Sequence, residues 1–405
     1  LNILIKEGYG YTEFAKHQLC KSPEELKRFY FNAGRITALL HMLGCTDCHH
    51  ENLIASSDQL ILIDTETLLE PELNNHINAT YENSGEPQAS ELSERFYKSV
   101  LRSGLMPQWM FIGAQQQAVD ISALGMIPPL KEVQKVAGWL GINTDGMMPG
   151  RVERKSELPT SLPVGIGAEN PFSVNIDVYS SGFKQQSEEF IAYRARWLGN
   201  ESPLATFAGL PRRIVLRNTR VYFSIQEQQL SPTALRSSTK QALKLEQLAR
   251  SFLLAQEKPL NWPIFASEVR QMQNLDIPFF THLISGDSLR LDQPGEEVND
   301  FIKTSGLTAA YHRLEKLDKS EIDFQLKLVY GSLAAKQLRN EKNNETTMQL
   351  QASKKLNRNI STDGPLLAAS KIAERIDGLA IKDAGGQCEW LGMNLGRDGM
   401  SFRFG

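Results

Sequence analysis

Cysteine is scarce in this chain, which has only four such residues among 405. That usage argues against a disulfide framework and is typical of a reducing compartment. No apolar run approaches the ~20 residues that a membrane-spanning helix needs. The formal net charge is only −3, which argues against wholesale binding of nucleic acid or of an anionic membrane. We therefore expect a cytoplasmic protein with no nucleic-acid partner and no stable membrane insertion.

The rest of the composition is that of an ordinary globular protein, with 41% hydrophobic and 22% charged residues. A chain of 405 residues is expected to form two or three domains. It opens on an alternating apolar strand without an initiator methionine, and it ends without a helix or a polar tail. We expect both ends to be cut from a longer protein.

The most informative stretch is residues 44–70, which predicts a tight loop, a β-hairpin and a second loop. The hairpin turns at Ser56-Ser57-Asp58 between two apolar strands. A hairpin returns its second end close to its first, so polar residues at both ends can converge. Four of them carry hard oxygen donors: Asp47, Asn52, Asp64 and Glu66. Such a set favours Mg²⁺ over zinc.

The order Asp-x-His-x-x-Asn, then eleven residues, then Asp resembles that of phosphoinositide kinases. In such phosphotransferases the first Asp orients the attacking hydroxyl, while the Asn and the last Asp hold Mg²⁺ on the triphosphate. Asp47 takes the first role here, and Asn52 and Asp64 take the second. Glu66 is a further candidate, both as a Mg²⁺ ligand and as a catalytic residue. His49 completes the pattern as a candidate catalytic residue. The protein-kinase order of these residues is not present.

Other interpretations of this stretch are weaker. Each polar residue alone could be a turn cap or a satisfied structural side chain. Cys45 and Cys48 form a C-x-x-C motif. A zinc site needs a second such pair, and a thioredoxin-like site needs a βαβ context, whereas a helix is predicted before this motif. His49-His50-Glu51 lacks the His-x-x-x-His spacing of a metallohydrolase.

A helix is predicted to lead directly into the Asp47 loop. Ser22 and Pro23 are a helix start, the apolar stripe continues to Leu43, and Gly44 stops the helix. The aromatic connector before it, residues 9–14, occupies the place of an interlobe hinge in a kinase-like fold. Glu13 and Phe14 are therefore candidates to contact a nucleotide base, although a simple strand-to-helix loop fits equally well.

Several motifs together resemble the dehydratase region of LanM-type (class II) lanthipeptide synthetases over essentially the whole chain. They are YGYTEF from residue 9, FYFNAGRITALLHMLGCTDCHHENLIA from 29, LIDTETLLEP from 62, SVLRSGLMP from 99, RIVLRNT from 213, DIPFF from 276 and EWLG from 389. Cys48 and His50 stand where aromatic residues are common in this family, and Leu69 where Phe is common. These departures concern packing around the loop.

The resemblance implies a bacterial enzyme that dehydrates Ser and Thr in a precursor peptide made of a leader and a core. ATP and Mg²⁺ would phosphorylate the hydroxyl, and elimination of phosphate would give dehydroalanine or dehydrobutyrine. Similarity gives Arg213 and Thr219 the elimination role, with Arg102 as a third candidate. It further implies an ATP-gripping Lys upstream of Leu1, a zinc cyclase domain after Gly405, and association with a transporter or protease.

The fold implied is α+β and mostly helical, a kinase-like (lipid-kinase-like) C-lobe with additional helical regions. We expect residues 1–22 to be the end of an N-lobe strand and the hinge, and 23–110 the catalytic core. Residues 111–337 would be the activation, substrate and phosphate-elimination region, and 338–363 a polar linker or helix end. Residues 364–405 would be a helical lead-in to a missing cyclase domain.

Local patterns add further expectations. Periodicity predicts helices at 89–102, 130–138, 182–198, 233–257, 297–317, 321–337 and 366–381. The aromatic stripe Phe183, Phe190 and Trp197 favours core packing over a substrate groove. The Gly- and Pro-rich residues 143–166 predict a mobile loop.

Residues 212–223 alternate like a strand and hold four arginines: Arg212, Arg213, Arg217 and Arg220. Clustered arginines can clamp phosphate bidentately, or they can simply form a solvated strand face. In a straight strand Arg213 and Thr219 would lie about 20 Å apart. Both can reach one phosphate only if the segment bends, and Asn218 is the expected position.

Two other functions stay open from the residues alone. One is a non-catalytic kinase-like scaffold that binds peptide or partner without turnover, and the other is a lipid or small-molecule kinase. Loss of water from the acceptor would indicate a dehydratase, gain of phosphate a kinase, and no mass change a scaffold.

Overall fold

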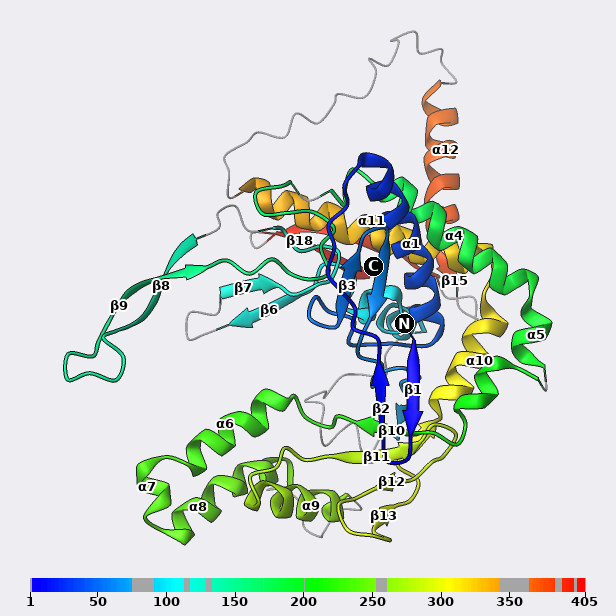
Figure 1. The fold of residues 1–405 in the computed structure, drawn as a ribbon. Coiled ribbons are helices and arrows are strands. Elements are labelled where there is room, and N and C mark those ends of the chain that lie inside the picture. The colour runs from blue at the N-terminus through cyan, green and yellow to red at the C-terminus, as the bar shows by residue number, and fades with distance from the viewer. Residues whose placement is uncertain are drawn as a thin grey trace.

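The computed structural model of the protein interleaves helices with short β-strands (Figure 1). It describes residues 2–74, 91–112, 117–128, 133–169, 171–199, 201–252, 261–342, 364–382, 388–396 and 399–404. The α+β class is confirmed in this coarse form. Within these ranges only one sheet has more than two strands, so helices and loops carry most of the packing.

Helix α1 (Pro23–Met42) occupies the middle of the fold (Figure 1). The Ser22 side chain accepts a hydrogen bond from the Glu25 backbone N–H, which caps the helix before its first-turn proline. At the other end Gly44 has φ of 63°, a conformation that favours glycine and redirects the chain. The predicted helix is confirmed, and it does lead into the Asp47 loop.

Helix α4 (Ile176–Ala192) packs against α1 at very close range. A Cβ atom on Gly34 would lie 2.0 Å from the Tyr179 carbonyl oxygen, and one on Gly182 would lie 2.0 Å from the Phe31 carbonyl oxygen. Each helix therefore places a glycine where the other backbone crosses it. A larger residue at either position would push the helices apart.

A single large apolar core surrounds these two helices. Phe183 and Phe190 of α4 are each 2% exposed, so the predicted core role of the aromatic stripe is confirmed. Three further elements close this core: η1 (Val100–Ser103), α10 (Gly306–Lys316) and α11 (Lys319–Lys342). Helix α3 (Glu91–Tyr97) precedes η1, and α5 (Arg194–Leu198) and η2 (Pro203–Phe207) follow α4.

The predicted hairpin is also confirmed. Strands β3 (Leu53–Ser56) and β4 (Gln59–Leu62) pair antiparallel with Leu53 opposite Leu62. Leu53 and Leu60 face the core and are at most 5% exposed. The turn contains Ser57 with φ of 55°. The hairpin therefore returns the chain to the level of the Asp47 loop.

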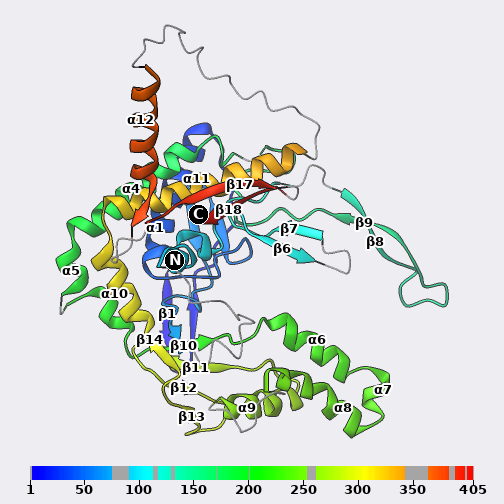
Figure 2. The same cartoon turned by 180° about the vertical axis from the view of Figure 1, so that it is seen from behind.

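A second group of elements lies apart from α1 and α4 in both views (Figures 1 and 2). Its sheet has the order β10 (Pro211–Ile214), β11 (Phe280–Leu283), β12 (Leu289–Arg290), β13 (Glu297–Val298). Its helices are α6 (Thr219–Gln229), α7 (Pro232–Leu235), α8 (Ser238–Leu245), η3 (Glu246–Phe252) and α9 (Trp262–Gln273). It has two apolar cores of its own. Strand β14 (Ile302–Thr304) pairs with β5 (Glu72–Leu73), which follows the β3–β4 hairpin along the chain.

The remaining strands form peripheral hairpins. They are β1 (Ile3–Lys6) with β2 (Tyr9–Thr12), β6 (Trp109–Ile112) with β7 (Gln117–Asp120), and β8 (Val133–Leu140) with β9 (Met148–Lys155). The β8–β9 hairpin projects away from the helices in both views (Figures 1 and 2). After α12 (Gly364–Leu379) come β15 (Ile381–Lys382), β16 (Cys388–Glu389), β17 (Leu391–Gly396) and β18 (Gly399–Phe404).

Helices predicted at 182–198, 321–337 and 366–381 are confirmed within a few residues by α4 with α5, α11 and α12. The region 89–102 is helical but divided between α3 and η1. Residues 75–90 lie outside the described residues. So does most of the predicted linker 338–363, of which only the start belongs to α11.

The helix predicted at 130–138 and the loop predicted over 148–155 were wrong, because β8 and β9 pair there over eight residues each. Residues 156–166 contain no helix or strand, as the predicted loop requires. Gly141 and Asn143 adopt positive φ, which turns the chain back so that the two strands can pair. Short apolar runs fit both helical and strand periods, and pairing across the turn decides between them.

Three other predicted elements have different bounds in the structure, because helix caps that periodicity does not reveal fall inside them. The expected strand 212–223 stops after Ile214, and Asn218 caps α6. The expected helix 233–257 is divided into α7, α8 and η3, with Ser237 capping α8. The expected helix 297–317 begins only after Ser305, its cap, and is preceded by β13 and β14.

Two terminal predictions also need correction. The aromatic connector at residues 9–14 is mostly strand β2, which pairs with β1. Residues 364–405 are helical only as far as Leu379, and β17 and β18 then pair as a hairpin. No helix in the described part of the chain is long and apolar enough to cross a membrane.

Candidate active site

The loop that carries Asp47 is held on both sides by backbone hydrogen bonds. The Cys45 N–H donates to the Leu40 carbonyl at 2.9 Å, and the Cys48 N–H donates to the Ser103 carbonyl at 2.7 Å. Gly104 stands so close that a Cβ on it would lie 3.1 Å from the Cys48 carbonyl carbon. Asp47 is therefore positioned by α1 on one side and by η1 on the other.

Asn52 and His49 both contact Asp47. The Asn52 side-chain nitrogen donates to the Asp47 carbonyl oxygen at 2.8 Å and lies 3.4 Å from Asp47 Oδ2. His49 Nε2 lies 3.5 Å from Asp47 Oδ1. Because the side-chain nitrogen of Asn52 makes these contacts with Asp47, the side-chain oxygen Oδ1 of Asn52 remains available to bind a metal ion. The three residues of the predicted Asp-x-His-x-x-Asn pattern thus form one contact group.

The hairpin brings Asp64 back to the same region. The Ile63 N–H donates to the Asn52 carbonyl oxygen at 3.0 Å, so Asp64 follows directly on a residue bonded to Asn52. Asp64 Oδ1 accepts a hydrogen bond from the Glu66 N–H at 3.0 Å. Asp64 Oδ2 makes no hydrogen bond to any described residue. The two ends of the hairpin are therefore adjacent, as the sequence predicts.

The donor chemistry at the hairpin ends fits Mg²⁺. Amide and carboxylate oxygens are the ligands this ion prefers, and it usually keeps several waters beside one or two protein ligands. Asn52 and Asp64 supply two such donors. In the described ranges no group of three or more His, Cys, Asp or Glu side chains could hold a metal by itself. The predicted assignment of Asn52, Asp64 and Glu66 to Mg²⁺ thus stays a prediction.

Arg213 reaches this region from the second group of elements. It lies on β10, and its Nη1 is 3.2 Å from Glu66 Oε1 and 3.3 Å from Oε2. Its guanidinium carbon is 5.5 Å from the centre of the Phe279 ring, and its Nε is buried without a hydrogen-bond partner. The predicted elimination residue is thus in direct contact with a predicted residue of the Mg²⁺ cluster. Sequence spacing did not reveal this contact.

Arg212 explains why β10 lies where it does. This arginine is 6% exposed, donates from Nε to the Leu68 carbonyl oxygen at 2.7 Å, and forms an ion pair with Glu70. Buried ion pairs fix geometry because neither partner tolerates separation. Arg212 therefore ties β10 to the loop after the hairpin and positions Arg213, its neighbour.

The other two arginines of the cluster do not share this role. Arg217 forms an ion pair with Glu268, whose side chain is fully buried and also accepts from the Tyr222 hydroxyl at 2.6 Å. It is a structural residue of the second core. Arg220 is exposed on α6. The sequence offered two interpretations of this stretch, clustered arginines that clamp a phosphate and a solvated strand face. Neither describes all four arginines.

Thr219 is the first residue of α6 and is exposed. The chain does turn at Asn218, whose side chain accepts from the Arg220 N–H at 3.0 Å as the helix cap. A bend at this position is what the predicted joint role of Arg213 and Thr219 requires. No hydrogen bond among the described residues joins the two side chains.

The two hinge candidates directly follow strand β2 of the N-terminal hairpin. Glu13 accepts hydrogen bonds from the backbone and side-chain nitrogens of Asn2, at 3.1 and 3.0 Å. Phe14 is 87% exposed. An exposed aromatic ring is available to stack on a base, but the described residues do not bring these two side chains to Asp47 or Asn52 by any contact.

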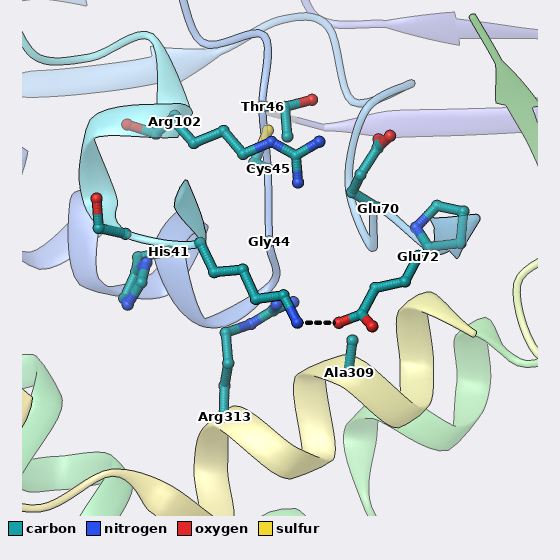
Figure 3. Close-up of a pocket in the computed structure, with 13 residues that line it drawn as sticks. His41, Gly44, Cys45, Thr46, Glu70, Glu72, Arg102, Ala309 and Arg313 are labelled. Carbon is teal, nitrogen blue, oxygen red and sulfur yellow. Dashed lines mark hydrogen bonds and ion pairs between the residues drawn. The ribbon is translucent and has the colours of Figure 1, made fainter. Parts of the chain in front are cut away.

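Arg102 lies in a separate pocket beside the Asp47 loop (Figure 3). Its guanidinium is 4.6 Å from the centre of the Tyr97 ring. No hydrogen bond or ion pair of the described residues joins it to Asp47, Glu66 or Arg213. The predicted role of Arg102 in phosphate elimination thus stays a prediction.

The two cysteines that flank Asp47 form a contact of their own. Their sulfur atoms are 3.0 Å apart, with the Cys48 thiol donating to Cys45 Sγ. That bond lowers the pKa of Cys45 and raises the pKa of Cys48. Both side chains are buried, at 3% and 0% exposed. The pair packs beneath the loop and offers too few ligands for zinc.

The fold and the site together define the class of protein. It is a protein of mixed helices and strands, in which a hairpin links an Asp-His-Asn loop to Asp64 and in which Arg213 of β10 contacts Glu66. A family model described as "Domain of unknown function (DUF4135)" matches residues 1–282, and the chain belongs to this family. The Lacticin 481/lactococcin biosynthesis protein LcnDR2 of Lactococcus lactis subsp. lactis is 31% identical over 68 residues, which are 17% of this chain and 7% of that protein. The resemblance to a LanM-type dehydratase region is thereby confirmed.

Proposed function

We propose that this chain is the dehydratase region of a lanthipeptide synthetase. It would phosphorylate Ser and Thr residues of a precursor peptide with ATP and then eliminate phosphate to leave dehydroamino acids. The contact between Glu66 and Arg213 carries this proposal, because it joins the loop suited to phosphoryl transfer to the residue suited to elimination. The biosynthetic role printed for the Lactococcus relative supports it.

The phosphorylation step is assigned to a kinase-like arrangement. Asp47 orients the Ser or Thr hydroxyl and accepts its proton, with Asn52 and His49 fixing the Asp47 side chain through the contacts described above. Bound Mg²⁺ would neutralise charge on the triphosphate, held by Asn52 and Asp64. The Asp47 loop, the β3–β4 hairpin and the predicted metal ligand Asp64 follow one another along the chain. This order supports a kinase-like C-lobe around α1 and β3–β4.

In the elimination step a base removes the Cα proton while the bond between Cβ and the phosphate oxygen breaks, and a cation is needed where negative charge develops on the leaving phosphate. Hydroxide leaves poorly and phosphate leaves well, which is the reason to phosphorylate first. Arg213 supplies a guanidinium fork suited to a phosphate dianion, and Thr219 supplies a hydroxyl donor from the start of α6. Such contacts contribute most in the transition state. Glu66 holds Arg213 at the mouth of the hairpin until the phosphate is present.

The proposal also covers the substrate, the location and the partners of the protein. A precursor peptide with leader and core would be the substrate, and a cytoplasmic location would suit ATP-dependent chemistry on it. Zinc would belong only to a cyclase domain beyond this chain, and export would fall to an associated transporter or protease. Glu13 and Phe14 would contact the adenine base.

A mass measurement tests the proposal against its alternatives. The full-length protein is incubated with its precursor peptide, ATP and Mg²⁺, and the peptide is weighed. Loss of about 18 Da per modified residue, with ATP consumed, supports dehydration through phosphoryl transfer. A gain of about 80 Da that never converts would indicate a kinase. An unchanged peptide that still binds would indicate a scaffold.

A further inference from the structure

A pocket opens beside the Asp47 loop, between residues 44–46, η1, β5 and α10 (Figure 3). Its empty volume is about 440 Å³, including the part open to solvent. Three cationic side chains line it, Lys98, Arg102 and Arg313, together with two carboxylates, Glu70 and Glu72. The lining of the pocket therefore carries three positive and two negative charges.

Both carboxylates of the pocket are already engaged. Glu72 lies 2.5 Å from the Lys98 ammonium and accepts from the Thr304 hydroxyl at 3.2 Å. Lys98 also contacts Glu94 at 2.6 Å. Glu70 forms an ion pair with Arg212 of β10. Neither carboxylate is left to neutralise the two arginines.

Arg102 and Arg313 consequently lack a carboxylate partner among the described residues. Arg102 only contacts the Tyr97 ring. Arg313 donates from Nε to the Met42 carbonyl oxygen at 3.0 Å, while its Nη2 is buried without a hydrogen-bond partner. Burial, with a smaller contribution from the charge of Arg102, lowers the pKa of Arg313 to about 10 against the opposing effect of Glu72. Arg102 and Arg313 thus line one pocket without a carboxylate partner, an arrangement that a bound anion would stabilise.

Gly44 makes this arrangement possible. Its φ is 63°, and a Cβ on it would lie 2.2 Å from Arg313 Nη2. The guanidinium therefore fills the place of a missing side chain against the loop. Nearby His41 stays neutral, because burial and the charge of Arg313 lower its pKa to about 3.

We infer that this pocket binds an oxyanion of the phosphate class between Arg102 and Arg313. Guanidinium groups recognise phosphate through paired hydrogen bonds, and two of them match a dianion in charge. The pocket borders the Asp47 loop but its lining does not include Asp47, Asn52 or Asp64, and the inference does not depend on the proposed dehydratase activity. Inorganic phosphate and the phosphate of a phosphoserine side chain share this chemistry.

Calorimetry of the chain with inorganic phosphate, at constant ionic strength and without nucleotide or peptide, tests the site directly. Saturable binding is expected, and it should persist in Asp47→Asn because that residue lies outside the pocket. A second titration with a short phosphoserine peptide identifies the source of the anion. Binding of phosphate alone assigns the site to free phosphate, and binding of both assigns it to phosphomonoesters as well.

Arg102→Gln is the decisive variant, since Arg102 makes no side-chain hydrogen bond with the described residues that folding would lose. Phosphate should bind it roughly tenfold or more weakly, as expected when a charge-assisted contact is removed. Arg290→Gln, an exposed arginine paired with Glu297, is the matched control and should bind like the unmodified chain. Absence of phosphate binding, or equal binding by Arg102→Gln, overturns the inference.

Discussion

Arg213 Nη1 lies 3.2 Å from Glu66 Oε1, although the two residues are 147 positions apart in the sequence. The contact spans the two groups of elements, since Glu66 follows the central hairpin and Arg213 lies on β10. It also places the residue assigned to phosphate elimination beside the residues assigned to phosphoryl transfer. Under the proposed function, both half-reactions would therefore use residues of one region, and the phosphorylated intermediate would need no second site for its elimination.

The first prediction separates the half-reactions. Arg213→Ala or Thr219→Ala in the full-length protein should still phosphorylate the peptide, because Asp64 keeps its bond from the Glu66 backbone. Elimination should fail, so that peptide about 80 Da heavier per site accumulates. Mass spectrometry reads the result, with Arg220→Ala as the exposed control on the same segment. Recovery of unmodified peptide would instead tie Arg213 to phosphoryl transfer or to folding.

Asp64→Asn should abolish phosphorylation and dehydration together. The substitution keeps the shape of the side chain but removes the charge that a divalent cation requires. Phosphopeptide and dehydrated peptide are both quantified by mass spectrometry, and circular dichroism checks the fold. Accumulation of phosphopeptide at a near-normal rate would show that Asp64 is not a metal ligand.

Asp47→Ala should slow phosphoryl transfer by roughly 10²-fold or more, the scale of general-base catalysis. Nucleotide affinity should change little, because Asp47 is assigned to the hydroxyl and not to the triphosphate. Turnover and ATP binding are measured on the same preparation. A parallel loss of both would point to a structural role through the Asn52 contact.

Stability should fall in mildly acidic solution through His282. This side chain is fully buried, and both ring nitrogens lack hydrogen-bond partners. Burial, with the charge of Arg212 beside it, lowers its pKa from 6.5 to about 4. The unfolded chain therefore binds the proton first, and the contribution to stability is lost as the pH falls below about 6.5, levelling off below about 4.

The slope attributable to His282 is at most about 1.4 kcal/mol per pH unit within that window. Chemical denaturation at pH 7, 6 and 5 measures it, and His282→Gln removes the titrating group. The difference in stability between the two proteins should shrink toward acid pH. A difference that does not vary with pH would show that His282 does not titrate on unfolding.

The contact between α1 and α4 should tolerate no side chain at its glycines. Gly182→Ala places a Cβ 2.0 Å from the Phe31 carbonyl oxygen, and overpacking of this kind costs about 1–3 kcal/mol. The thermal midpoint should fall accordingly. Gly378→Ala is the control, since nothing lies within 4 Å of a Cβ there and alanine favours helix α12. An unchanged midpoint for Gly182→Ala would mean that the helices separate at little cost.

Local sequence was a good guide wherever short-range chemistry decides the structure. Ser22 and Pro23 begin α1, Gly44 ends it, and Ser57 turns the hairpin, each through contacts within a few residues. The grouping of Asp47, Asn52 and Asp64 follows from the same short-range geometry. Residues 130–138, 148–155 and 212–257 were misread because their periodicity is ambiguous, and caps such as Asn218 and Ser237 depend on where neighbouring elements lie.

The sequence by itself determined the helix that enters the Asp47 loop, the order of the polar residues in that loop and the family to which the chain belongs, because these depend on neighbours along the chain. Only the tertiary structure decided that Arg213 contacts Glu66, that Arg212 and Glu70 hold β10 in place, and that Arg102 and Arg313 line one pocket. Each of these joins residues more than a hundred positions apart, and no local pattern marks Arg313. Burial of the apolar faces of α1, α4 and α10 in one core, together with the pairing of β5 with β14, brings these distant segments into contact.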